Sequence, residues 1–198
     1  MFYDALKKQC PLQIDPFKAL VGPRPIGWIS SMAPDGTANL APYSFFNGVS
    51  DNPPMVVFSS AGRKDSIANI EKTGEFVCNL ATWDLRDAMN ASAAGVGAEV
   101  DEFELAGLEK AASVMVKPPR VAGSPVALEC RHTQTIALQD IDGGVLNYSL
   151  VIGQVVGIYI DDALIVDDRV QISKAKPIAR HGYRDYSMVT ELFRLERP

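Results

Sequence analysis

The segment from Arg24 to Asp65 constrains the fold more than any other part of the chain. It holds three apolar, strand-like runs, which are joined by turns and end in serine, asparagine and cationic residues. Asp35-Gly36 is typical of a tight turn, because glycine tolerates positive φ and aspartate bonds its own backbone. Pro53-Pro54 interrupts the pattern, since proline has no amide donor. These short runs between turns predict β-structure.

The rest of the chain continues this pattern with few helices. The helix predicted over residues 66–73 has Asp65 as its N-cap, whose carboxylate accepts the first free amides. Helices are inserted between strands and do not alternate with them as βαβ units, which favours a mainly β fold and a closed antiparallel barrel. Strands are predicted over residues 26–31, 38–42, 45–50, 55–59, 75–81, 126–138 and 146–160.

Length and charge narrow the class of protein. With 198 residues and 47% hydrophobic residues, the chain is expected to form one domain with a sizeable core. No apolar run approaches the roughly 20 residues that span a bilayer, and the N-terminus lacks the pattern of a secretory signal. We therefore expect a cytoplasmic protein that does not bind membranes. The net charge of −5 argues against a nucleic-acid partner.

The cysteines and histidines predict no metal site. Cys10, Cys78 and Cys130 are widely spaced and form no C-x-x-C motif. Cys78 and Cys130 lie in apolar runs, where a free cysteine packs as a small hydrophobic residue. His132 and His181 are the only histidines in the chain, too few for a histidine-rich metal centre.

The loop after the 55–59 run has the composition of an anion site. It combines hydroxyls, cations and a glycine with the start of a helix, whose free amides favour negative charge. The alternative is a solvated loop that leads into a capped helix. The candidate residues are Ser59, Ser60, Arg63, Lys64, Asp65 and Ser66.

A second candidate region, residues 44–47, places aromatic rings beside short polar groups. Ser44 and Asn47 flank Phe45 and Phe46, and such a segment offers both apolar faces and hydrogen-bonding groups to a flat ligand. The alternative is two core phenylalanines on opposite faces of a strand. In a regular strand only one of the two rings can face a ligand.

The motifs RPIGWISS, DGTANLAPYSFFNGVSDNPPMVVFS, KDSIANI and TGEFVCNL resemble those of the flavin reductase-like proteins. The resemblance covers roughly residues 10 to 190 and implies the FMN-binding split β-barrel fold. It places the FMN phosphate at Lys64, Ser66 and the backbone around Ser60 and Arg63. Residues 44–47 would follow the edge of the isoalloxazine, and FAD is the alternative flavin. The resemblance also implies a homodimer with flavin sites near the subunit interface.

Four more residues have a functional and a structural interpretation. Trp28 either stacks on the flavin or fills the core, and Asn79 bonds either the flavin or a neighbouring strand. Arg24, between two prolines, would bind a phosphate or a partner chain. His181 occupies the place of a family segment that returns to the flavin, where it would serve nicotinamide binding, proton delivery or simple hydrogen bonding. Relatives often have glycine there, and a surface histidine is the alternative.

The sequence thus predicts a flavin-dependent oxidoreductase that passes hydride from NAD(P)H to flavin and on to an acceptor or redox partner protein. No catalytic side chain is assigned, because the cofactor carries the chemistry. A flavoredoxin-like electron carrier without a nicotinamide site and a non-enzymatic flavin-binding protein are the alternatives. The acidic residues Glu99, Asp101, Glu102 and Glu104 are predicted to be solvated.

Overall fold

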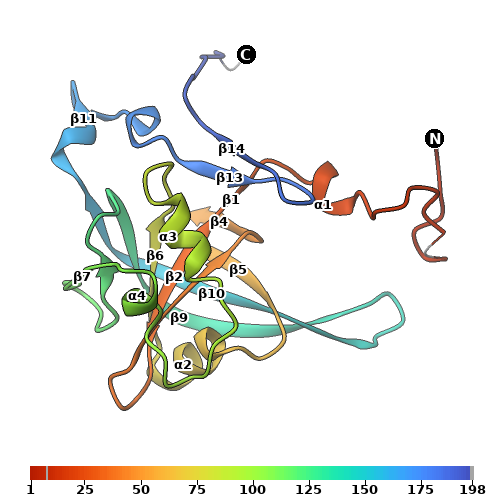
Figure 1. Cartoon of the computed structure of the whole chain (residues 1–198), viewed down its shortest axis with the longest axis horizontal. Helices are drawn as coiled ribbons and strands as arrows, with labels where there is room; N and C mark the ends of the chain where they lie inside the picture. Colours follow the sequence, from red (N-terminus) through yellow and green to blue (C-terminus); the bar gives the residue numbers. More distant parts are fainter. Residues whose placement is uncertain (8, 197–198) are drawn as a thin grey trace.

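The computed structural model describes residues 1–7 and 9–196 and has a mainly β fold (Figure 1). Its centre is a seven-stranded antiparallel sheet with the order β3-β2-β6-β9-β10-β5-β4. All seven predicted strands are confirmed as members of this sheet. Its strands are β2 (Gly27–Met32), β3 (Ala38–Tyr43), β4 (Phe46–Asp51), β5 (Pro54–Ala61), β6 (Glu75–Leu80), β9 (Val126–Gln139) and β10 (Val145–Ile160).

Strand β2 is buried on both faces and separates two parts of the core. Because successive side chains of a strand point to opposite faces, Trp28 and Ile29 enter different clusters. Ile29 packs with Phe58 and Phe76 inside the curved sheet. Trp28 packs on the other face with Phe103 and further apolar side chains. Cys78 and Cys130 are buried free thiols in the first cluster, which confirms their predicted packing role.

The predicted closed barrel is wrong, because the sheet stays open between β3 and β4. Within residues 1–7 and 9–196, no hydrogen-bonded ladder joins these two edge strands. They follow one another in the chain, and the backbone passes from one edge to the other through a bend at Ser44 and Phe45. The two edges are therefore connected covalently at one corner but are not paired along their length.

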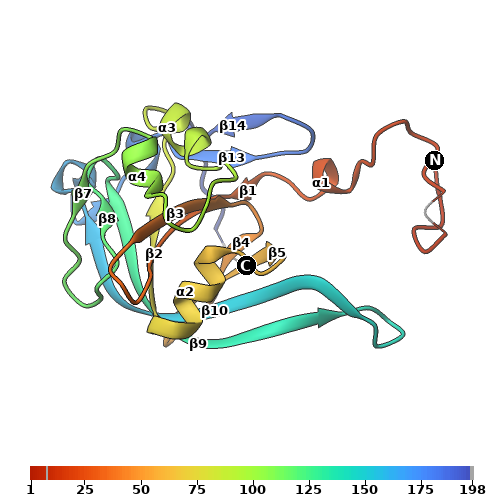
Figure 2. The same ribbon diagram turned by 60° about the horizontal axis from the view of Figure 1, so that its bottom comes forward.

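Helices cover the sheet at the corner where it opens. Helix α2 (Asp65–Thr73) packs against β2 and β3, and Figure 2 shows it above β9 and β10. Its N-cap is Lys64 and Asp65 is already helical, so the predicted Asp65 cap is wrong by one residue. The other helical elements are α1 (Phe17–Leu20), α3 (Arg86–Ala91), α4 (Glu102–Leu105), η1 (Asp162–Leu164) and η2 (Ile172–Ala175).

A three-stranded antiparallel sheet with the order β1-β13-β14 lies beside the main sheet. Its register places Arg24 opposite Arg180, and Arg180 opposite Tyr186. These strands bring the segment before β2 next to the segment after β10. The smaller strands are β1 (Arg24–Pro25), β13 (Ile178–Arg180), β14 (Tyr186–Met188), β7 (Lys110–Ala111), β8 (Arg120–Val121), β11 (Ile165–Val166) and β12 (Arg169–Val170).

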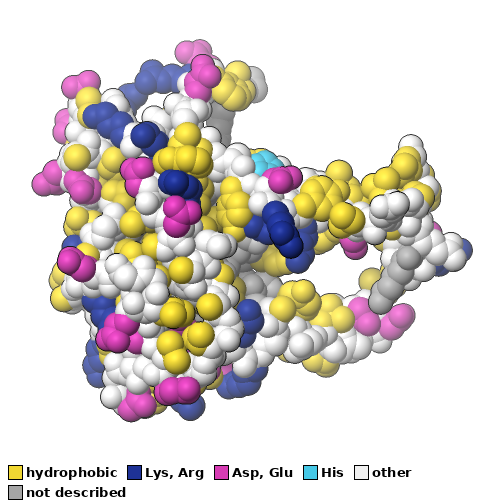
Figure 3. All heavy atoms as spheres, in the orientation of Figure 1, with side chains coloured by type: hydrophobic (Ala, Val, Ile, Leu, Met, Phe, Trp, Pro, Cys, Tyr) yellow, Lys and Arg dark blue, Asp and Glu magenta, His cyan; other side chains and the backbone are white. Residues whose placement is uncertain are grey.

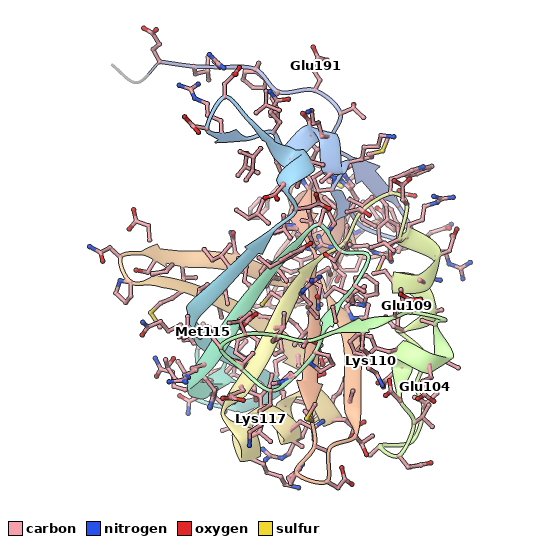
Figure 4. All side chains as sticks on the ribbon, turned by 90° about the vertical axis from the view of Figure 1, so that its left-hand side faces the viewer. Glu104, Glu109, Lys110, Met115, Lys117 and Glu191 are labelled. Atoms are coloured by element: carbon pink, nitrogen blue, oxygen red, sulfur yellow. The ribbon has the colours of Figure 1, made fainter. Side chains whose placement is uncertain are left out.

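A loop after β7 crosses the side of the molecule shown in Figure 4, where Met115 and Lys117 are labelled. Buried Glu129 of β9 holds this loop, since its carboxylate accepts the amides of Val114 at 2.9 Å and Met115 at 2.5 Å. The loop therefore belongs to the packed body and lies on β9 through backbone hydrogen bonds.

Two segments project from the body as prongs, the N-terminal segment and the end of the β9–β10 hairpin (Figures 1 and 3). Hydrophobic side chains lie on both prongs in Figure 3, and the exposed ones include Phe2, Leu6, Ile141 and Val145. In the part of the chain that the structure describes, no helix is long and apolar enough to cross a membrane.

Candidate functional site

The predicted anion loop connects β5 to α2. Ser60 is buried near the end of β5, and Gly62 turns the chain with a φ of +75°, a conformation that favours glycine. Lys64 then has extended backbone and α2 begins. The side chains of Arg63 and Lys64 are exposed, and Arg63 pairs with Glu71 of α2. The loop therefore presents two cations beside the free amides of a helix start.

These cations line a cavity of about 340 Å³, which we call the loop hollow. Strand β3 forms one wall, the start of α2 forms a second, and the segment after α3 closes the third side. The volume lies in the range of small-molecule sites, about 300–1,000 Å³. The lining residues are Asn39, Ala41, Pro42, Tyr43, Arg63, Lys64, Asp65, Ser66, Ser92, Ala93, Ala94, Gly95, Val96 and Glu102.

Polar side chains lie beneath the loop hollow. Ser66 is buried, and its hydroxyl lies 3.3 Å from the Asn39 amide nitrogen, which donates to it. The Tyr43 hydroxyl is buried without a hydrogen-bond partner of good geometry in the described chain. Burial raises the pKa of Tyr43, and the nearby hydroxyls of Ser66 and Ser60 oppose that shift. An unpaired buried hydroxyl is costly, which makes this wall suited to a polar ligand group.

Glu102 adds a carboxyl group to the loop hollow. It is 7% exposed, and its Oε2 accepts the Leu40 amide of edge strand β3 at 3.0 Å. Burial raises the pKa of Glu102, and the charges of Asp65 and Asp101 act in the same direction, against the Leu40 hydrogen bond. The prediction that Glu102 is solvated is therefore wrong, because α4 places it against the β3 edge.

The bend between β3 and β4 carries the predicted aromatic segment. Phe45, Phe46, Asn47, Ser44 and Ser59 all line one open hollow of about 400 Å³. The Phe46 ring also packs against the core and lies so close to Gly27 that a Cβ there would meet it at 2.5 Å. Asn47 is exposed.

A third hollow, of about 370 Å³, lies between α3 and the β1-β13-β14 sheet; we call it the arginine chamber. His181 lines it, and its Nε2 lies 2.8 Å from the Ser187 hydroxyl. Arg24 forms another part of the wall and is only 6% exposed. Its Nη2 donates to the His181 carbonyl at 2.8 Å, and its Nη1 bonds the carbonyls of Lys18 and Val21.

The three hollows adjoin one another. The loop hollow and the arginine chamber share Pro42 and Ala93 as wall residues. The arginine chamber and the hollow at the bend share Arg24 and Ser44. The structure thus places the anion loop, the β3–β4 bend and His181 around three adjacent hollows, which together we call the groove.

Trp28 and Asn79 line none of these three hollows, and both side chains have structural partners instead. Trp28 has no exposed surface, and its Nε1 donates to the Ser92 hydroxyl at 2.9 Å. It thereby positions a wall residue of the loop hollow. Both polar groups of the Asn79 side chain bond the backbone: its Nδ2 donates to the Trp28 carbonyl at 3.0 Å, and its Oδ1 accepts from the Val121 amide at 2.8 Å.

Sequence reasoning missed several residues of the groove. Tyr43 belongs to the quoted motif, but its buried hydroxyl has no signal in sequence. Arg180 reaches the groove because β13 pairs with β1, and Glu102 reaches it because its carboxylate accepts the Leu40 amide of β3. Both partners are distant in sequence. Within the described chain, no cluster of histidine, cysteine or acidic residues fits a metal ion.

Comparison with known proteins adds a family and solved relatives. The family model described as "Flavin reductase like domain" matches residues 22–171. A protein of Aquifex aeolicus (strain VF5), described as uncharacterized, is 35% identical over 173 residues and covers 84% of this chain and 85% of its own.

Two solved structures are also similar to this chain. Nitrilotriacetate monooxygenase component B from Bacillus cereus has a TM-score of 0.83 and 31% identity, over 94% of this chain and 100% of its own. The 2-nitrobenzoate 2-nitroreductase NbaA of Pseudomonas fluorescens has a TM-score of 0.86 and 28% identity, over 100% of this chain and 96% of its own.

Proposed function

Since the chain belongs to the flavin reductase-like family, we propose that it is a flavoprotein oxidoreductase that binds FMN in the loop hollow. In this proposal NAD(P)H is the reductant, and electrons pass on to a further acceptor. The names of the solved relatives, a monooxygenase component and a nitroreductase, support redox chemistry of this kind. We propose one domain for the whole chain, with the same flavin site in each copy.

The observation that carries the proposal is the position of the anion loop in the groove. Lys64 and Arg63 lie at one end, next to the first amides of α2 and the Ser66 hydroxyl. This set matches a phosphate group, which combines negative charge with several acceptor oxygens. The bend at Ser44 lies further along the same groove, and its backbone would follow the edge of the flavin ring.

The donor set also fits a flavin. The unpaired Tyr43 hydroxyl and the buried Ser66 hydroxyl are neutral donors at the wall. Burial raises the pKa of Glu102, so its carboxyl group loses a proton less readily than it would in water. The adjoining hollows give an elongated ligand room beyond the loop hollow. FAD, with its longer nucleotide part, is the alternative cofactor.

Bound flavin would accept a hydride and release electrons in one or two steps. The residues of this chain bind the phosphate, orient the ring and limit access of water. His181 lies at the adjoining chamber, held by Ser187, and we propose a role for it in binding the nicotinamide. No side chain is required as an acid or base for the hydride step.

A cytoplasmic homodimer completes the proposal. The exposed hydrophobic side chains of the two prongs support a second copy as the partner, because isolated apolar projections are unfavourable in water. The flavin sites would then lie near the subunit interface.

An anaerobic absorbance measurement tests the function. Purified protein loaded with FMN is mixed with NADH or NADPH, and flavin bands near about 370 and 450 nm are followed. Rapid bleaching supports the reductase. Bands that persist with nicotinamide but bleach with a redox partner identify a flavoredoxin-like carrier. If FMN does not bind at all, the flavoprotein proposal is wrong.

A further inference from the structure

Two arginines face one another in the sheet that borders the arginine chamber. Arg24 of β1 is directly opposite Arg180 of β13 in the register, and Tyr186 of β14 follows on the other side of Arg180. Opposed residues of an antiparallel pair have Cβ atoms about 4.5–5.5 Å apart, and like charges at such positions destabilise the sheet. The protein therefore keeps a repulsive pair at the wall of a hollow.

Within the described residues, no carboxylate relieves this repulsion. Among residues 1–7 and 9–196, neither arginine forms an ion pair, and no acidic side chain lines the chamber. Burial lowers the pKa of Arg24, and the charge of Arg180 lowers it further. The Nε of Arg24 is buried without a hydrogen-bond partner in the described chain. A buried cation without an anion is costly, so the chamber is electrostatically incomplete.

Arg24 is fixed, whereas Arg180 is available to a ligand. Backbone carbonyls hold both terminal nitrogens of Arg24, which therefore contributes charge from a rigid position. Arg180 is half-buried; its Nη2 donates to the Tyr183 carbonyl at 2.7 Å, and its guanidinium lies 4.4 Å from the Tyr186 ring centroid. These contacts set its plane, and among the residues that the structure describes no side chain accepts from the other donors of its guanidinium.

Aromatic faces accompany the charges. Tyr183 and Tyr186 line the chamber and are 50% and 42% exposed. Tyr183 has a φ of +56°, an uncommon backbone conformation for a non-glycine residue, which holds it in the turn between β13 and β14. Flat phenol rings beside an arginine offer stacking and charge to the same ligand.

We propose that the arginine chamber binds an anion that carries a flat ring, with its carboxylate or phosphate on Arg180 and its ring against Tyr186. The anion would offset the Arg24–Arg180 repulsion. The chamber adjoins the loop hollow through Pro42 and Ala93, so this ligand is the second substrate of the bound flavin. That last assignment rests on the proposed function, whereas the anion site itself does not.

Isothermal titration calorimetry tests the site with two probes, benzoate and ADP-ribose, on protein as purified and on protein saturated with FMN. The variant is Arg180→Gln. The matched control is Arg184→Gln, which removes the same charge from the same turn at an exposed residue that does not line the chamber. We expect at least one probe to bind the unchanged protein. Arg180→Gln should raise the Kd of that probe about tenfold or more, and Arg184→Gln should raise it less than about twofold.

Thermal unfolding gives a second readout. The bound probe should raise the Tm of the unchanged protein above that in sodium chloride of equal ionic strength, and this increase should vanish in Arg180→Gln. Without probe, the Tm of Arg180→Gln reports the balance between the removed Arg24–Arg180 repulsion and the lost contacts with Tyr183 and Tyr186. A probe-induced increase in Tm that persists in Arg180→Gln would therefore be the result that contradicts the site.

The outcomes separate the ligand sources and the two proposals. Binding of benzoate identifies a free aromatic acid, and binding of ADP-ribose identifies a nucleotide. Absence of saturable binding of both probes, or equal losses in Arg180→Gln and Arg184→Gln, overturns the anion site. Probe binding by a protein that does not bind FMN would uphold the site and overturn the flavoprotein proposal.

Discussion

Replacing Lys64 with glutamine should weaken the binding of FMN far more than the binding of riboflavin, which lacks the phosphate. Lys64 is exposed and forms no ion pair in the described part of the chain, so the change leaves no charged partner behind. A hydrogen bond to a charged group contributes about 1.5–3 kcal/mol, and solvent reduces this at an exposed residue to about 1–2 kcal/mol. The Kd of FMN should therefore rise roughly tenfold, and the Kd of riboflavin should stay nearly constant.

Quenching of flavin fluorescence measures both affinities at two salt concentrations. The matched control is Lys72→Gln, because Lys72 is an exposed lysine in the last turn of the same helix. The difference between FMN and riboflavin should shrink at high salt, since exposed charges are screened. Equal losses for the two flavins, or an equal effect of Lys72→Gln, would refute the phosphate assignment.

Three further changes test other parts of the groove. Glu102→Gln should lower the Kd of FMN roughly fivefold at pH 7, because it removes about 1 kcal/mol of repulsion between the carboxylate and the phosphate. Burial raises the pKa of Glu102, so its neutral form stabilises the fold at low pH, and this contribution is lost as pH rises through the raised pKa. When FMN binding is titrated from pH 5 to 8, the Kd values of the variant and the unchanged protein should converge at the acid end. Trp28→Phe should lower the unfolding free energy in urea by about 1–2 kcal/mol through the lost bond to Ser92, with an unchanged spectrum of bound flavin; a shifted spectrum would mean ring contact. Gly27→Ala should destabilise by about 1–3 kcal/mol, because the new methyl group meets the Phe46 ring; unaltered stability would show that this ring moves freely.

The strands were predictable because their information is local. Apolar runs such as Met55–Ser59, bounded by turn residues, specify a strand without reference to the rest of the chain, and β5 contains that run. Closure of the sheet depends on whether two edges pair. The bend at Ser44 and Phe45 keeps β3 and β4 apart, and no local pattern describes that geometry.

Burial of polar side chains was the other limit of sequence reasoning. Glu102 stands among acidic residues and looks solvated, yet in the folded protein its carboxylate accepts a hydrogen bond from the Leu40 amide. Asn79 was equally suited to a ligand or to a strand, and its two backbone partners decide for the strand. The Arg24–Arg180 pair depends on a register between distant segments.

A crystal structure of the protein with FMN tests the central claim most directly. We expect the phosphate within hydrogen-bonding distance of Lys64, Ser66 and the first amides of α2, with the ring extending along the groove past Pro42 towards Ser44. A phosphate bound at Arg24 and Arg180 instead, with the loop hollow free of flavin, would contradict it.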